Sequence, residues 1–164
     1  MRARAFTLLE MLVTITVVAV VAAVVAPMFS DDNRLHLMAG SSVLASDIEL
    51  AQVMTISFPD QAVVVKFDPS KQTYWLAYAS DPDTPITRTD TNEPYLVMLG
   101  KGRALSAQGV QMQLVQVAND TLEFNAQGGL VDFTATPSIQ LTRGGSKITL
   151  AVATATGTVS ETGG

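Results

Sequence analysis

Residues able to do chemistry are few and scattered in this 164-residue chain. It contains no cysteine and a single histidine, His36, so neither a thiolate site nor a histidine-based metal cluster or charge-relay triad can form. Asp81 and Asp83 have the one-apart spacing of a calcium loop, but no EF-hand glycine or closing glutamate follows. Residues 100–103 lack the glycine spacing of a phosphate-binding loop. The sequence therefore predicts a protein that is not an enzyme and that binds no metal or cofactor.

One charged residue is notable for its surroundings. Glu10 directly precedes residues 11–29, an uncharged run that consists mostly of Val, Ala, Ile, Leu and Met. About 20 helical residues cross the hydrocarbon core of a membrane, so a helix over this run is long enough to span one. A carboxylate costs roughly 2.5–3.5 kcal/mol at the centre of such a helix and less near an end, so it usually has a function. The alternative is that Glu10 reaches the lipid headgroups and has no specific partner.

The charges on either side of the apolar run predict its orientation. Arg2 and Arg4 precede it, and Asp31 and Asp32 follow it. The positive-inside rule then places the N-terminus in the cytoplasm and the rest of the chain on the other side of the membrane.

The end of the apolar run contains a proline. Pro27 is expected to bend or end the helix, because it lacks a backbone N–H and its ring clashes with the preceding turn. An ordinary secretory signal is the alternative interpretation, with cleavage after Ala26. That cut would leave Pro27 as the first residue and would place the charged Glu10 within the apolar region of the signal.

The segment Ala5-Phe6-Thr7-Leu8-Leu9-Glu10 resembles the processing site of type IV prepilins and type II secretion pseudopilins. The resemblance implies that prepilin peptidase cuts between Ala5 and Phe6, and that the new amino group of Phe6 is methylated. It also implies that Glu10 acts in filament assembly, and Pro27 falls where many members carry a helix-bending proline. The family usually has Gly before the cut, whereas this chain has Ala5.

The chemistry of Glu10 agrees with this resemblance. After the cut, the α-amino group of Phe6 is cationic near neutral pH. A carboxylate in a water-free filament core needs a partner, since removing one member of a buried ion pair costs about 3–5 kcal/mol. We therefore expect Glu10 to pair with the Phe6 amine of a neighbouring subunit, which would set the axial register of the filament.

An amphipathic helix is expected beyond the apolar run. Asp47, Glu49 and Gln52 fall off its apolar stripe, residues 40–42 are a soft point, and the helix is expected to end near Ser57. The stripe recurs at spacings of seven, four, three and three residues, which are typical of one helical face: Leu37, Leu44, Ile48, Ala51 and Met54.

After residue 59 the pattern changes to the period of two that is typical of strands. Strands are expected at 62–68, 73–79, 95–99, 110–114, 122–124, 130–133, 139–141 and 148–152. Hairpin turns are expected around residues 69–70, 100–103 and 144–145, and residues 81–92 form a polar connection that is either a partner-contacting surface or a solvated loop.

These elements predict an α+β fold in which a long N-terminal transmembrane and amphipathic helix packs on an antiparallel β-sheet domain. The expected domains are a leader at 1–5, the helix at 6–57 with its transmembrane part at 6–29, and a β-rich periplasmic domain at 58–164.

The last third of the chain contains an ordered series of short motifs. Leu122-Glu123-Phe124, Gly128-Gly129, the strands at 138–141 and 148–152 and Gly157-Thr158-Val159 resemble the C-terminal domain of H-type minor pseudopilins and their FimT-like pilin relatives. The resemblance implies a minor pseudopilin of type II secretion, single-pass in the bacterial inner membrane and assembled into a periplasmic filament for protein export. Its implied partners are other pseudopilin or pilin subunits, prepilin peptidase and the inner-membrane assembly platform.

A FimT-like minor type IV pilin that acts in DNA uptake or pilus assembly is the alternative. The net charge of −5 and the lack of Lys or Arg in residues 154–164 disfavour nucleic-acid binding, because neutralising phosphates dominates that affinity. The sequence leaves open whether a secretion or a pilus system is served.

Overall fold

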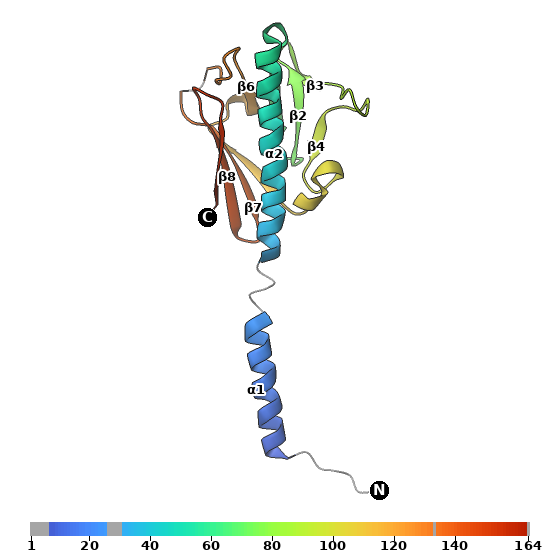
Figure 1. Ribbon diagram of the computed structural model, residues 1–164, viewed down its shortest axis with the longest axis vertical. Helices are drawn as coiled ribbons and strands as arrows, with labels where there is room; N and C mark the ends of the chain where they lie inside the picture. Colours follow the sequence, from blue (N-terminus) through green and yellow to red (C-terminus); the bar gives the residue numbers. More distant parts are fainter. Residues whose placement is uncertain (1–6, 26–30, 133, 164) are drawn as a thin grey trace.

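The computed structural model describes residues 7–25, 31–132 and 134–163. Two α-helices come first along the chain, α1 (Leu8–Val25) and α2 (Asp31–Ser57). Figure 1 shows α1 apart from a globular body, in which α2 runs lengthwise with strands on both sides.

Helix α2 ends at Ser57, where the sequence predicts its end. The N–H of Phe58 donates to the carbonyl of Met54 at 2.9 Å, and a 3-10 turn, η2 (Pro59–Gln61), follows. Proline suits the first position of that turn because its N–H would have no helical partner there. The predicted apolar stripe is also confirmed, since four of its members are at most 1% exposed: Leu37, Leu44, Ile48 and Ala51.

The first sheet is built around a hairpin that the sequence predicts. Strands β1 (Val63–Asp68) and β2 (Thr73–Tyr78) pair antiparallel, and β6 (Thr121–Glu123) pairs with the other edge of β1. Strands β3 (Asp81–Pro85) and β4 (Leu96–Met98) both pair with β2, at different positions along it.

The second sheet has the order β5-β7-β8-β9, and all its pairs are antiparallel. Its strands are β5 (Gln111–Val115), β7 (Ser138–Arg143), β8 (Ser146–Val152) and β9 (Val159–Gly163). The turn between β7 and β8 contains Gly144 and Gly145, as predicted.

The predicted α+β fold is therefore confirmed, with two antiparallel sheets where one sheet was expected. Side chains of both sheets share one core with α2. Period-two alternation shows which side of a strand is buried. It does not show which other strand is its neighbour, so it could not divide the strands into two sheets.

Two strands lie where the sequence predicts none. Strand β3 contains Pro82 and Pro85, which exclude a central strand but are tolerated where β3 pairs at the end of β2. Strand β9 is mostly exposed and polar, so it lacks the alternation that reveals a buried face. Conversely, residues 130–133 form no strand among the described positions: Leu130 makes a single bridge to Phe124, and Phe133 lies outside the described residues.

One local prediction near the middle of the chain is wrong. The predicted hairpin turn at 100–103 leads into a 3-10 helix, η3 (Gly102–Ala107), which packs Ala107 against α2. Helix α2 continues without a break through residues 40–42, and a softer helix there stays a prediction. A Cβ on Gly40 would lie 3.1 Å from the Cβ of Ala107, so this glycine lets η3 approach the helix closely.

Candidate functional site

The structure describes one of the four residues predicted to act in processing and assembly. Ala5, Phe6 and Pro27 lie outside the described residues, so cleavage, methylation and the helix bend stay predictions. Glu10 lies in the first turn of α1 and is exposed.

The start of α1 has the spacing of a capping box. Thr7 directly precedes the helix, and its Oγ1 accepts a hydrogen bond of 3.2 Å from the N–H of Glu10. Thr followed three residues later by Glu is the pattern in which both side chains can satisfy unpaired N–H groups of a helix start. Within the described residues no ion pair involves the Glu10 carboxylate. Its charge is therefore available to a partner outside them.

Beyond Glu10, the surface of α1 carries apolar side chains on every side. None of its 18 residues is buried, and its exposed fractions reach 85% at Leu8 and 66% at Val18. Thr16 conceals its hydroxyl by donating to the carbonyl of Leu12 at 2.6 Å. A helix that is hydrophobic all round must be covered by lipid or by other protein. By length and composition α1 is able to cross a membrane, and a signal sequence near an N-terminus would meet the same criteria.

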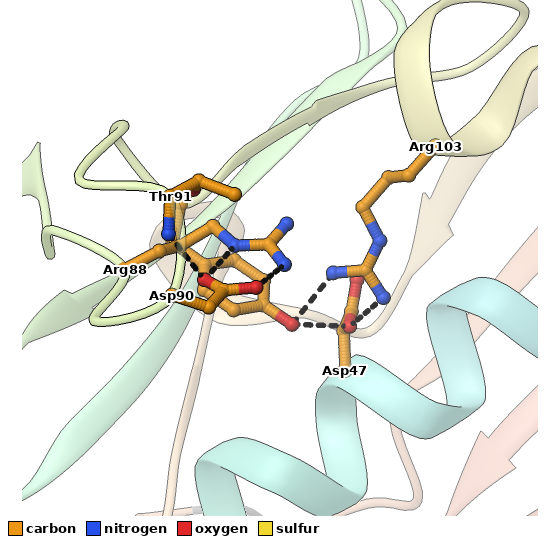
Figure 2. Close-up of polar contacts among 6 residues, drawn as sticks. Asp47, Arg88, Asp90, Thr91 and Arg103 are labelled. Atoms are coloured by element: carbon orange, nitrogen blue, oxygen red, sulfur yellow. Dashed lines mark hydrogen bonds and ion pairs between the residues drawn. The ribbon is translucent and has the colours of Figure 1, made fainter.

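A buried carboxylate joins α2 to the first sheet and to η3. Asp47 is 1% exposed, and three side chains donate to it. Figure 2 shows one of these donors, Arg103, beside Asp47. The hydroxyl of Tyr74 lies 2.7 Å from Oδ2, the hydroxyl of Tyr95 lies 2.7 Å from Oδ1, and Nη2 of Arg103 lies 2.9 Å from Oδ1. We call these four residues the Asp47 cluster. Burial, reinforced by the neighbouring carboxylate, raises the pKa of the Tyr74 hydroxyl above its ordinary value.

The Asp47 cluster also holds part of the connection between β3 and β4. The guanidinium carbons of Arg88 and Arg103 lie 5.2 and 5.3 Å from the centre of the Tyr95 ring, within range of cation–π attraction. Arg88 in turn forms two hydrogen bonds with Asp90, at 2.8 and 3.1 Å (Figure 2). Residues 81–92 thus include strand β3 and a tethered turn, rather than only a solvated loop.

Sequence reasoning missed this cluster because it gave weight to residue type over spacing. Asp47 was expected off the apolar stripe, yet it lies three residues after Leu44 and four before Ala51, on the same helical face. That spacing was the signal that could have found it. Its partners Tyr95 and Arg103 are 48 and 56 residues away, so no local pattern includes them.

The glycine motifs of the last third meet beside α2. The amide of Gln52 donates to the carbonyls of Gly128 and Thr156, both at 2.7 Å, so Gln52 connects α2 to two separate turns. Gly157 has φ of +67°, and a Cβ there would lie 2.1 Å from the carbonyl oxygen of Gly128. Position 157 therefore requires glycine, both for its backbone conformation and because a side chain there would collide with Gly128.

We expect Gly157→Ala to destabilise the protein far more than Gly145→Ala. Both glycines have positive φ, so both substitutions strain the backbone by about 1–2 kcal/mol. A Cβ on Gly145 meets nothing within 4 Å, whereas one on Gly157 collides with Gly128 and Gln52, which adds about 1–3 kcal/mol. Urea denaturation of the detergent-solubilised chain, followed by circular dichroism, measures the difference. Equal losses for the two variants would contradict the role given to the contact.

Comparison with known proteins gives two findings, one for the N-terminal segment and one for the fold. Residues 1–26 match the prokaryotic N-terminal methylation motif. Among solved structures, the chain is similar to the minor pseudopilin EpsH from the type 2 secretion system of Vibrio cholerae. The TM-score is 0.55 and the identity 12%, over 78% of this chain and 97% of that chain. A comparison with curated proteins found no match. The chain thus combines a prepilin-type N-terminus with a pilin-like fold.

Proposed function

From a prepilin-type N-terminus on a pilin-like fold, we propose that this chain is a minor pseudopilin subunit of a type II secretion pseudopilus. Prepilin peptidase cuts it between Ala5 and Phe6, and Phe6 is then methylated. Helix α1 inserts in the bacterial inner membrane with its N-terminus in the cytoplasm and the body in the periplasm. The assembly platform then adds the subunit to a filament of other pseudopilins. The observation that carries the proposal is the apolar α1, which has no buried residue and has Glu10 in its first turn, joined to a pilin-like body.

The construction of the molecule suits such a transfer from membrane to filament. The buried core consists of residues of α2, η3, the sheets and their connections, and no residue of α1 is buried in it. The surroundings of α1 can therefore change from lipid to neighbouring helices while the core of the body stays intact. A structural subunit needs no catalytic group for this role.

The C-terminal end of the body supports the secretion role over DNA uptake. The described residues there form strand β9, which pairs with β8. Glu161 on this strand accepts a hydrogen bond of 2.8 Å from the buried Ser41. The described part of this end is thus a paired strand whose one charged group is acidic, instead of a free basic tail that would neutralise phosphates.

Intact mass and N-terminal sequencing of the membrane-extracted protein test the proposal. With coexpressed prepilin peptidase the chain should begin at Phe6 and carry one methyl group, and without the enzyme it should begin at Met1. The variant Ala5→Gly should be cut at least as completely, because it restores the residue that the family usually has before the cut. A chain that begins at Met1 under both conditions, or near Pro27, would overturn the proposal.

A further inference from the structure

The turn between β7 and β8 is packed against the beginning of α2. A Cβ on Gly144 would lie 2.4 Å from Nδ2 of Asn33, and Nη2 of Arg143 lies 3.5 Å from Oδ2 of Asp32. Figure 1 shows the lower ends of β7 and β8 beside the first turns of α2, at the end of the body nearest α1. The position of this turn is therefore fixed by the position of the α2 N-terminus.

Chain length keeps that N-terminus near the membrane. Helix α1 ends at Val25 and α2 begins at Asp31, so five residues separate them. An extended chain spans at most about 3.3–3.6 Å per residue, so the two helix ends are no more than roughly 20 Å apart. The headgroup region adds about 5–8 Å beyond the hydrocarbon on each side. With α1 inserted, a connection shorter than this maximum brings the β7–β8 turn to the headgroups.

The charges at this end differ from those of the rest of the body. Residues 31–164 contain eight Lys or Arg and fourteen Asp or Glu, so the body as a whole is acidic. In sequence, the turn and the start of α2 contain three cations, Arg34, Arg143 and Lys147, and two acids, Asp31 and Asp32. The Asp32 carboxylate faces Arg143 and His36, each at 3.5 Å, which leaves Arg34 and Lys147 exposed without a described ionic partner.

We propose that Arg34 and the β7–β8 turn contact anionic lipid headgroups of the leaflet from which the body emerges, and so orient the body before assembly. This inference rests on the proposed insertion of α1. Each cation near an anionic leaflet strengthens contact by roughly fivefold, and the acidic remainder of the body is repelled by the same surface. The tip of the β7–β8 turn is open at Gly145, since a Cβ there would meet no atom within 4 Å.

Depth-dependent fluorescence quenching tests the contact with the full chain reconstituted in vesicles. Because the chain contains no cysteine, a dye on Ser146→Cys reports on the turn alone, and a dye on Asp60→Cys, next to the far end of α2, is the distant reference. The quencher is a lipid spin-labelled on its headgroup. Quenching of the Ser146→Cys dye should increase when phosphatidylglycerol is added to phosphatidylcholine vesicles. It should decrease again in high salt, and the Asp60→Cys dye should change little.

Charge variants separate the turn from the overall charge. Arg34→Gln combined with Lys147→Gln should remove the effect of phosphatidylglycerol, which corresponds to a contact weakened by roughly 25-fold for two cations. Gln61→Glu combined with Thr91→Glu changes the net charge equally at exposed sites elsewhere and should retain the effect. Equal quenching in both kinds of vesicle, or equal loss in both pairs of variants, would overturn the inference.

Flotation of the same samples with the vesicles distinguishes a failure of the headgroup contact from a failure of membrane insertion. If the chain floats but the turn is not quenched, insertion stands and the headgroup contact is wrong. If the chain does not float, the proposed insertion fails and this inference fails with it.

Discussion

Replacing Asp47 with alanine should lower the free energy of unfolding by about 3–5 kcal/mol, because it leaves a partly desolvated guanidinium without its partner. Arg103 would lose its carboxylate, and the hydroxyls of Tyr74 and Tyr95 would lose their acceptor inside the body. The side chain of Arg103 is 34% exposed, so water can relieve part of its loss, and the lower end of the range is the expected value. Urea denaturation of the detergent-solubilised chain measures the change.

Two further variants show that the cluster, and not helix composition, is responsible. Glu49→Ala removes an exposed acid two positions along the same helix and should change stability by no more than about 0.5 kcal/mol. Asp47→Leu combined with Arg103→Met removes both charges and should be less damaging than Asp47→Ala, since no buried charge is left unpaired. If Asp47→Ala were no more destabilising than Glu49→Ala, the stabilising role given to the Asp47 cluster would be wrong.

The Asp47 cluster also marks the boundary of what sequence reasoning could reach. The stripe of α2 and the β1–β2 hairpin depend on residues near one another in the chain, so their periodicity predicted them correctly. The pairing of β1 with β6 and the ion pair of Asp47 with Arg103 depend on contacts across more than fifty residues, which no window of sequence contains. The exposed edge strand β9 has no buried face to reveal it.

For the N-terminal segment predicted to act in processing and assembly, the sequence is more informative than the structure. A carboxylate beside an uncharged apolar run is visible from residue type alone, and the structure adds that Glu10 lies in the first turn of a helix with no buried residue. The structure gives no information on Ala5, Phe6 and Pro27, which lie outside the described residues. Their predicted roles rest on the sequence resemblance alone. What the structure contributes is the hydrogen bond from the Glu10 N–H to the Thr7 hydroxyl. With Thr and Glu at capping-box spacing, a local role of the Glu10 side chain at the helix start is the alternative that must be tested.

Replacing Glu10 with glutamine is expected to abolish filament assembly while leaving the stability of the body unchanged. Glutamine is nearly the same size as glutamate and is accepted at this position of a capping box, so the start of α1 should keep its local hydrogen bonds. It lacks the negative charge that would pair with the Phe6 amine of a neighbouring subunit in a water-free core. The amount of filament recovered by shearing, with all other assembly components present, measures the first effect. Urea denaturation measures the second.

The matched control keeps the charge of Glu10 and removes the capping hydroxyl. Thr7→Ala removes the hydroxyl that accepts the Glu10 N–H but keeps the charge, so it should weaken the helix start by about 0.5–2 kcal/mol and still permit assembly. If charge governs assembly, Glu10→Gln fails and Thr7→Ala succeeds. If capping governs it, the order is reversed, and the proposed ion pair between subunits is wrong. Because α1 has no buried residue in the body, neither outcome can be attributed to an unfolded body once the urea transitions agree.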